Sequence, residues 1–268
     1  MSGFYIGVDG KAQKTKGCYI GVNDVARKIK KIYLGDENGL AKEVYSSGKK
    51  LSEYTVGSTV YLNENGSPVE YLIVHQGLPS SMYDSSCNGV WLLRKDVYGN
   101  DKWHSTNENN YKSSTLHTYL NDGFLNLFDP AVKNAVKQVK IPYSRNNSSV
   151  YSGSNGLDTK VFILSCYEVG FTTSVSSDMP VEGAKLNYFE VGDTSGGTNR
   201  QKRIAKLNGT STSWWLRSPV KSNTTSVYTV ANGGNYSTST LTTSRGIRPA
   251  LILPNTLTVD LETNIVMG

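Results

Sequence analysis

The residues best suited to bind a ligand lie together in one polar stretch near the C-terminal end. From Lys221 to Ser244 nearly every residue is Ser, Thr, Asn or Tyr, and two adjacent glycines lie in the middle. Tyrosine gives a broad amphipathic contact surface at a low entropic cost, while Ser, Thr and Asn supply adaptable hydrogen bonds. This mixture favours a surface that binds a partner.

Two stiff segments flank the polar stretch. Residues 214–219 (WWLRSP) precede it, and residues 246–251 (GIRPAL) follow it. We expect Trp214, Arg217 and Arg248 to form a structural frame. Both arginines should be buried against backbone carbonyls or an acid, and contact with a ligand is the alternative. The candidate acids are Glu168 and Asp260.

The polar stretch is expected to fold as a β-hairpin. Residues 226–230 alternate with a period of two, which predicts a strand with one exposed face. Residues 232–235 form the turn, and residues 236–243 return as the second strand. The expected ligand-binding side chains lie on this hairpin and its border: Trp215, Asn223, Thr225, Tyr228, Asn232, Asn235, Tyr236, Thr238 and Thr240. The alternative is a solvated hairpin without a ligand.

Residue types that carry catalysis or bind metals are scattered. The chain has three cysteines and three histidines, without CxxC or His-Cys metal spacing, so we predict reduced cysteines, no metal and no cofactor. Nucleophile-elbow, P-loop and dinucleotide-binding signatures are absent, and we predict that the protein is not an enzyme. One alternative is a hydrolase of cell-wall polysaccharide, which needs two neighbouring carboxylates. Its candidate carboxylates are Asp84, Asp96, Asp101, Glu108 and Glu190.

The composition is typical of a loop-rich, β-rich extracellular or viral protein. Hydrophobic residues make up 37% of the 268 residues and charged residues 19%, with 26 Gly and 17 Tyr. No run approaches the roughly 18 apolar residues of a membrane span, and the N-terminus lacks a basic and then apolar leader. We therefore predict no membrane segment and no signal peptide, and expect a virion or cell lysis to carry the protein outside.

Residues 1–50 contain a repeat with a period of 14 residues, whose copies begin at Phe4, Cys18 and Ile32. The dipeptides Asp9-Gly10 and Asn38-Gly39 are strong hairpin-turn signals, and Asn23-Asp24 is a weaker one. The pattern predicts a meander of short antiparallel strands. Because each hairpin has too little apolar surface to fold alone, we predict an attachment or oligomerisation module; an ordinary small β-domain is the alternative.

The positive charge of the chain is concentrated in this repeat module. The net charge is +6, and residues 1–50 hold 10 basic and 5 acidic residues, whereas residues 51–268 hold 18 and 17. A nucleic-acid groove would spread its basic residues over the binding domain. We therefore predict no nucleic-acid partner.

Residues 51–268 predict a mixed body of strands and helices. Strands are expected at 54–62, 69–75, 90–94 and 161–165, from their β-branched and aromatic runs. A helix is expected at 112–121, capped by Ser113 or Ser114. A second helix is expected at 130–139, where Asp129-Pro130 gives an N-cap and a proline at the first helical position.

Several motifs follow one another in a fixed order over residues 54–255. They include Trp91, Trp103, Tyr111, Ser114, Leu116, Tyr119, Leu120, Asn121, Lys160 to Ser165, Glu168, Val169 and the two flanking segments 214–219 and 246–251. This set resembles a family of C-type-lectin-like domains from gut Firmicutes and their phages, related to the variable proteins of diversity-generating retroelements. The resemblance implies an α+β fold with two helices, a small twisted antiparallel sheet and long loops on one side.

The N-terminal repeat carries a second resemblance. Its clearest copy, YIGVNDVARK at residues 19–28, is similar to short repeats in tail and structural proteins of phages and prophages of Gram-positive bacteria. This resemblance implies that residues 1–50 join a virion or tail assembly.

Together these patterns predict two domains, a hairpin-repeat module at 1–50 and a C-type-lectin-like ligand-binding domain at 51–268. We expect a phage or prophage tail-associated receptor-binding protein, an adhesin located on the virion and assembled as a trimer. Its expected partners are a bacterial surface glycan or protein and other virion proteins. The alternatives are a structural decoration or baseplate protein and the cell-wall hydrolase.

Overall fold

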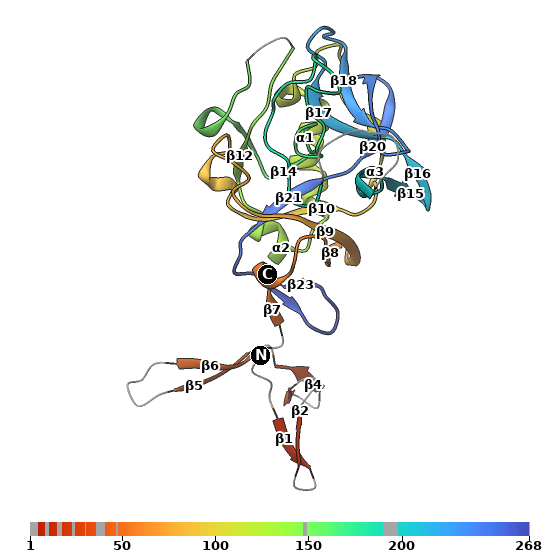
Figure 1. Ribbon diagram of the computed structural model, residues 1–268. Helices are drawn as coiled ribbons and strands as arrows, with labels where there is room; N and C mark the ends of the chain where they lie inside the picture. The colour runs from red at the N-terminus through yellow and green to blue at the C-terminus, as the bar shows by residue number, and fades with distance from the viewer. Residues whose placement is uncertain are drawn as a thin grey trace.

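The computed structural model describes residues 5–8, 11–14, 18–22, 25–29, 31–35, 41–46, 48–146, 149–189 and 198–267. The protein is mostly β, with 41% of residues in strands and 15% in helices. Within the described ranges there are three α-helices and many small sheets (Figure 1).

The expected α+β C-type-lectin-like fold, with two helices and one small twisted sheet, is wrong. The described strands form two five-stranded sheets and several sheets of two or three strands. The helices are only six to eight residues long. Short β-branched and aromatic runs separated by turns dominate the chain, and such runs form strands rather than helices.

The first five-stranded sheet is antiparallel and forms the centre of the body. Its strands, in sheet order, are β14 (Val161–Phe162), β21 (Ala250–Leu253), β10 (Gly89–Arg94), β9 (Ser67–Gly77) and β8 (Thr59–Glu64). The β8–β9 hairpin turns at Asn65 and Gly66, which both have positive φ, as tight hairpin turns require. Strands β10 and β21 are buried along almost their whole length, so this sheet is the main core.

The second five-stranded sheet contains the polar hairpin. Its strands, in sheet order, are β11 (Gly99–Lys102), β20 (Ser244–Ile247), β17 (Trp214–Pro219), β18 (Ser226–Val230) and β19 (Tyr236–Thr240). Only β17 and β20 run parallel; the other neighbours are antiparallel. The expected hairpin is thus β18–β19, and β19 lies at the edge of the sheet.

The described part of the chain contains three short α-helices. Helix α1 spans Thr115–Asp122, and the Ser114 hydroxyl accepts a hydrogen bond from the His117 amide as its N-cap. Helix α2 spans Pro130–Ala135, shorter than the expected 130–139, and its first residue is the proline. Helix α3 (Thr198–Arg203) lies in a region that the sequence pattern did not identify as helical. No described helix is long and apolar enough to cross a membrane.

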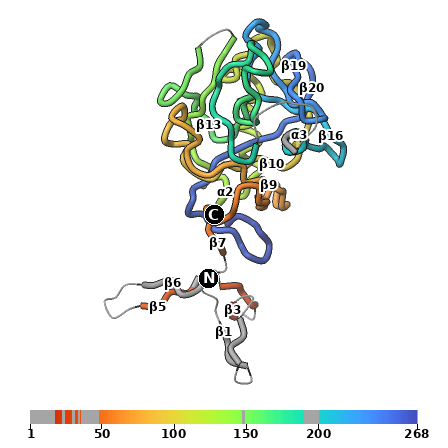
Figure 2. Tube along the Cα trace, in the orientation of Figure 1, coloured from red at the N-terminus to blue at the C-terminus, as the bar shows by residue number. Residues whose placement is uncertain are grey.

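Short 3-10 helices and small sheets complete the body. The 3-10 helices span Leu51–Glu53, Ser85–Cys87, Tyr111–Ser113, Phe124–Leu127 and Gly153–Asn155. The small sheets pair β12 (Val139–Ile141) with β13 (Leu157–Thr159), β15 (Ala205–Leu207) with β16 (Thr210–Thr212), and β22 (Thr258–Asp260) with both β7 (Gly48–Lys50) and β23 (Val266–Met267). The C-terminal residues therefore return to lie beside β7, as Figure 2 shows.

The N-terminal repeat forms three separate hairpins at one end of the molecule (Figure 1). They pair β1 (Tyr5–Val8) with β2 (Lys11–Lys14), β3 (Tyr19–Val22) with β4 (Val25–Lys28), and β5 (Lys31–Gly35) with β6 (Ala41–Ser46). Among the described strands the hairpins do not pair with one another, which corrects the expected meander. The predicted turn dipeptides Asp9-Gly10, Asn23-Asp24 and Asn38-Gly39 lie outside the described residues.

Candidate ligand-binding face and its buried frame

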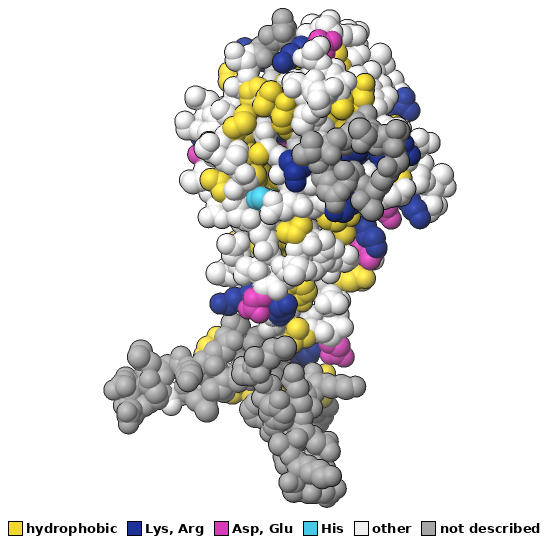
Figure 3. Space-filling model, viewed as in Figure 1, with side chains coloured by type: hydrophobic (Ala, Val, Ile, Leu, Met, Phe, Trp, Pro, Cys, Tyr) yellow, Lys and Arg dark blue, Asp and Glu magenta, His cyan; other side chains and the backbone are white. Residues whose placement is uncertain are grey.

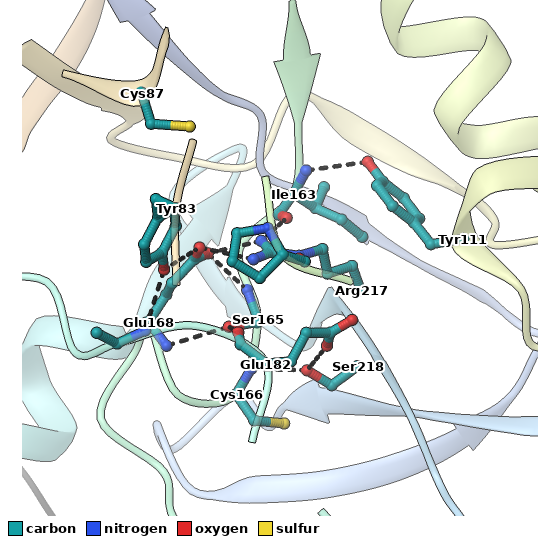
Figure 4. A network of polar contacts seen from close by, with 12 residues as sticks. Tyr83, Cys87, Tyr111, Ile163, Ser165, Cys166, Glu168, Glu182, Arg217 and Ser218 are labelled. Atoms are coloured by element: carbon teal, nitrogen blue, oxygen red, sulfur yellow. Dashed lines mark hydrogen bonds and ion pairs between the residues drawn. The ribbon is translucent and has the colours of Figure 1, made fainter. Parts of the chain in front are cut away.

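Arg217, in strand β17, lies at the centre of a buried polar network (Figure 4). Its Nη1 and Nη2 atoms each donate to an oxygen of Glu168 at 2.6 Å, and neither side chain is exposed. Its Nε and Nη1 atoms also donate to the carbonyls of Pro142 and Ile163, at 3.0 and 2.9 Å. Of the two candidate partners of Arg217, Glu168 and Asp260, Glu168 is the acid that forms the ion pair. Burial disfavours the charged guanidinium, but Glu168 more than offsets this and raises the pKa of Arg217 above its ordinary value.

Glu182 extends this network to a neighbouring loop. It is completely buried; its Oε1 atom accepts from the Ser144 amide and its Oε2 atom from the Ser218 hydroxyl, both at 2.6 Å. The Ser218 hydroxyl in turn accepts from the Cys166 amide at 2.9 Å. Burial raises the pKa of Glu182 to about 7. The network therefore ties β17 to the loop around residue 144 and leaves one carboxyl that titrates near neutrality.

Asn109 holds three loops together beside the start of β18. Its side chain is completely buried. The Nδ2 atom lies within 2.9 Å of the carbonyls of both Asn223 and Ser226 and 3.3 Å from that of Val220. Its Oδ1 atom accepts from the Asn146 amide at 3.1 Å. One amide side chain thus fixes the β17–β18 loop against the loops at 105–110 and 144–146.

The loops around Asn109 carry mostly polar residues, which we call the polar loop face: residues 105–108, 145–146, 172–178, 221–225 and 240–243. Ser222 donates to the Asp178 carboxylate at 2.5 Å, which joins the third segment to the fourth. Asn223 Oδ1 accepts from the amide and the hydroxyl of Thr225, at 2.9 and 2.8 Å. The Leu241 amide donates to the Thr225 carbonyl, which brings in the last segment. Internal hydrogen bonds therefore fix this face.

Two of the expected ligand-binding side chains are buried. Trp215 is 0% exposed, and its indole nitrogen donates to the Asp101 carbonyl at 2.8 Å. Tyr228 is 1% exposed, and its hydroxyl lies 2.8 Å from that of Ser176. All five residues of β18 are buried, which corrects the expected alternation with one exposed face. Neither side chain offers a surface to a ligand.

The other expected side chains fall along the hairpin in three places. Asn223, Thr225 and Thr240 lie at the loop end, where Ser226 pairs with Thr240. Thr238 is exposed on the edge strand β19. The remaining three lie at or beside the turn: Asn232 is exposed, while Asn235 and Tyr236 are half-buried. Only the loop-end group lies on the polar loop face.

The expected frame residues Trp214 and Arg248 pack against each other. Both are buried, and the Arg248 guanidinium lies 4.9 Å from the centre of a Trp214 ring. The Trp214 indole nitrogen donates to the Arg203 carbonyl at 2.9 Å.

The sequence patterns did not identify Arg203, Asn109 or Glu182 as buried residues, because a single polar residue in a polar run has no local pattern that marks it as buried.

Three of the carboxylates considered for hydrolysis accept hydrogen bonds from backbone amides. Asp84 accepts from the Ser86 amide, Asp96 from the Lys206 amide and Asp101 from the Lys102 amide. Glu108 lies on the polar loop face, and Glu190 lies outside the described residues.

Burial raises the pKa of the Cys87 thiol to about 12, which leaves it unreactive at neutral pH. No cluster of three or more metal-ligating side chains occurs in the described part of the chain.

Comparison with known proteins identifies one related family. A family model described as a domain of unknown function (DUF6273) matches residues 88–255, which is more than half of the chain. The matched region runs from just before β10 to just beyond β21 and so includes the frame and the polar loop face. No curated protein and no solved structure matches the chain.

Proposed function

We propose that this chain, which belongs to the DUF6273 family, is a tail-associated receptor-binding protein of a phage or prophage. Its polar loop face binds a glycan or protein on a bacterial surface. The observation that carries the proposal is a set of exposed hydroxyl and amide side chains on loops that the buried Asn109 holds in place. Hydroxyl and amide groups are the ones that exchange hydrogen bonds with sugars or peptides.

The loops of this face are ordered before any ligand arrives. Ordering a flexible side chain at an interface costs about 0.5–1.5 kcal/mol. Here Asn109 fixes the backbone of the β17–β18 loop, and Asn223 fixes Thr225. Because part of this cost is met on folding, small polar side chains suffice to bind with useful affinity.

The opposite end of the molecule has the chemistry of an attachment site. In the hairpin β3–β4, Tyr19, Ile20 and Val25 are each more than half exposed. An isolated two-stranded hairpin is only marginally stable in water. We therefore expect a protein partner to cover these apolar side chains. We propose that the hairpins join the virion as part of a homotrimer. This places the attachment end and the polar loop face at opposite ends (Figure 1).

The proposal is tested by binding the fluorescently labelled full chain to whole cells of a panel of gut Firmicutes. The test variant is Asn223→Asp with Thr240→Val. The aspartate keeps the acceptor for Thr225 but loses the Nδ2 donor, and valine removes a hydroxyl at nearly constant shape. We expect about tenfold weaker binding to the strains that the original chain binds, since each lost hydrogen bond is worth about 0.5–1.5 kcal/mol.

The matched control is Asn155→Asp, an exposed asparagine on a 3-10 helix outside the polar loop face. It should bind within twofold of the original chain, and all three proteins should melt at similar temperatures. If the double variant binds as tightly as the original chain, the polar loop face is not the site. A chain that binds no strain yet enters purified particles would instead support the structural decoration role.

A further inference from the structure

Strand β19 is an outer strand of the second five-stranded sheet, and among the described strands it pairs with β18 alone. Figure 2 shows it in the upper part of the body. An outer strand has a row of backbone N–H and C=O groups that point away from its sheet and can pair with another chain. Proteins usually protect such a row with charged side chains, proline, a bulge or a covering segment. The two large sheets have four outer strands, which can be compared.

Strands β8 and β14, the outer strands of the first sheet, are both covered. In β8 the Tyr61 amide donates to the Asn264 carbonyl at 2.9 Å, on the side away from β9. In β14 the Asn121 side chain accepts from the Val161 amide at 3.1 Å and donates to the Val161 carbonyl at 3.0 Å. Neither strand therefore offers a free row of backbone groups.

Strand β11, at the far side of the second sheet, is protected by charge and by a side chain. Asp101 and Lys102 are exposed, and the Asp101 carbonyl accepts from the Trp215 indole at 2.8 Å. Strand β19 has the sequence YSTST, without charge, proline or glycine, and pairs with β18 in an unbroken register of five residues. Its last carbonyl, that of Thr240, accepts from the Thr243 amide at 3.1 Å. The described residues leave the rest of its outward row open.

The side chains of β19 hold the strand in the sheet and leave short hydroxyl groups at its surface. Ser239 is buried, and its hydroxyl accepts from Arg245 Nε at 3.2 Å. The upper part of the body is mainly white in Figure 3, the colour of uncharged polar side chains and backbone. The exposed residues of the strand are Ser237, Thr238 and Thr240.

The sequence of β19 matches itself when it is reversed. Ser237, Thr238 and Ser239 read the same in both directions around Thr238. In an antiparallel pair of two such strands, Thr238 would face Thr238, and each Ser237 would face a Ser239. Ser and Thr form hydrogen bonds across antiparallel strands, and no like charges would be opposed. A foreign peptide would take its specificity from pockets for its side chains, whereas a second copy brings matching short side chains.

We propose that β19 pairs antiparallel with β19 of a second copy of this chain, with Thr238 opposite Thr238. The two five-stranded sheets would then be continuous. Such a contact uses the same surface of both copies and joins them in pairs. It is therefore separate from the contact that would close the proposed homotrimer, and it stands independently of cell binding.

Disulfide cross-linking of the full chain tests the register. Thr238→Cys is combined with Cys18→Ser, because the other two native cysteines are buried. Facing residues of antiparallel strands have Cβ atoms about 4.5–5.5 Å apart, close to the distance that a disulfide spans. Mild oxidation should link most of the variant into covalent dimers. The control is Thr240→Cys with Cys18→Ser, equally exposed on the same strand. Its two copies would lie about 14 Å apart, so they should link at least about fivefold less.

Light scattering tests the contact without a cross-link. Thr238→Lys would place two lysines opposite each other and block strand pairing, so its molar mass should be half that of the original chain at a concentration where the original is paired. The control Thr256→Lys changes an exposed threonine in the turn before β22 and should keep the original mass. Equal cross-linking of the two cysteine variants, or equal masses of Thr238→Lys and the original chain, would overturn the proposal and leave the edge to a strand of another protein.

Discussion

At the scale of single residues, buried polar groups decide the geometry of the candidate site. Asn109 determines where the exposed side chains of the β17–β18 loop lie, although it is itself inaccessible. Arg217 and Glu168 satisfy each other, so replacing one partner would leave a buried charge unpaired and cost about 3–5 kcal/mol. Glu182 differs, because its buried carboxyl has no bonded cation among the described residues.

Glu182 gives a prediction about pH. Burial raises its pKa in the folded protein to about 7 from an ordinary value of 4.5. Between pH 4.5 and pH 7 the folded state therefore holds a proton on Glu182 that the unfolded state releases. The protonated Glu182 contributes its full stability below pH 4.5, and this contribution is lost as the pH rises through 7. Because glutamine does not titrate, the free energy of unfolding of the Glu182→Gln variant should change less between pH 5 and pH 8 than that of the original chain.

Urea unfolding at the two pH values measures this difference. The control is Glu108→Gln, which removes an exposed carboxyl on the polar loop face. This variant should keep the pH dependence of the original chain. The assignment fails if Glu182→Gln and the original chain lose the same stability between pH 5 and pH 8.

At the scale of elements, short segments are positioned by caps and by coverage from distant parts of the chain. Helix α1 begins where the Ser114 hydroxyl accepts the His117 amide, and the sequence had left Ser113 and Ser114 both open as caps. The burial of strand β18, in contrast, could not be predicted from its own residues. Its alternation indicated an exposed face, yet all five residues are buried, and the Tyr228 hydroxyl bonds to Ser176, 52 residues earlier in the chain.

Ser114→Ala should lower the free energy of unfolding by about 1 kcal/mol, because the cap of α1 is lost. The matched control is Ser113→Ala, whose hydroxyl donates to the Asn110 carbonyl at 3.3 Å and caps no helix. Thermal unfolding of both variants compares them directly. A larger loss in the Ser113 variant would contradict the capping assignment.

Some of these elements can be predicted from the local sequence and others cannot. The hairpin β18–β19, the strand β10 and the start of α2 follow from local signals such as alternation, apolar runs and Asp129-Pro130. The burial of Tyr228 and the role of Asn109 depend on segments distant in the sequence, and no local pattern records them. The fold class was mistaken for a related reason, since the arrangement of many short strands into sheets depends on long-range pairing.

At the scale of the whole molecule, the proposed attachment and binding functions lie at opposite ends. The hairpin strands connect to the body through β7, which pairs with β22, and Lys28 Nζ lies 2.9 Å from both Asp260 and Glu262. Under the proposed function, a virion would hold the chain at its hairpins while the polar loop face remains accessible.

We propose that the polar loop face contacts the bacterial surface. Amide hydrogen exchange of the full chain, measured with and without surface polymer purified from a bound strain, tests this contact. We expect slower exchange in residues 105–109, 172–178 and 221–225 and unchanged exchange in the strands of the N-terminal hairpins. Unchanged exchange in all three loops while the polymer is bound, or slower exchange confined to the hairpins, would contradict it.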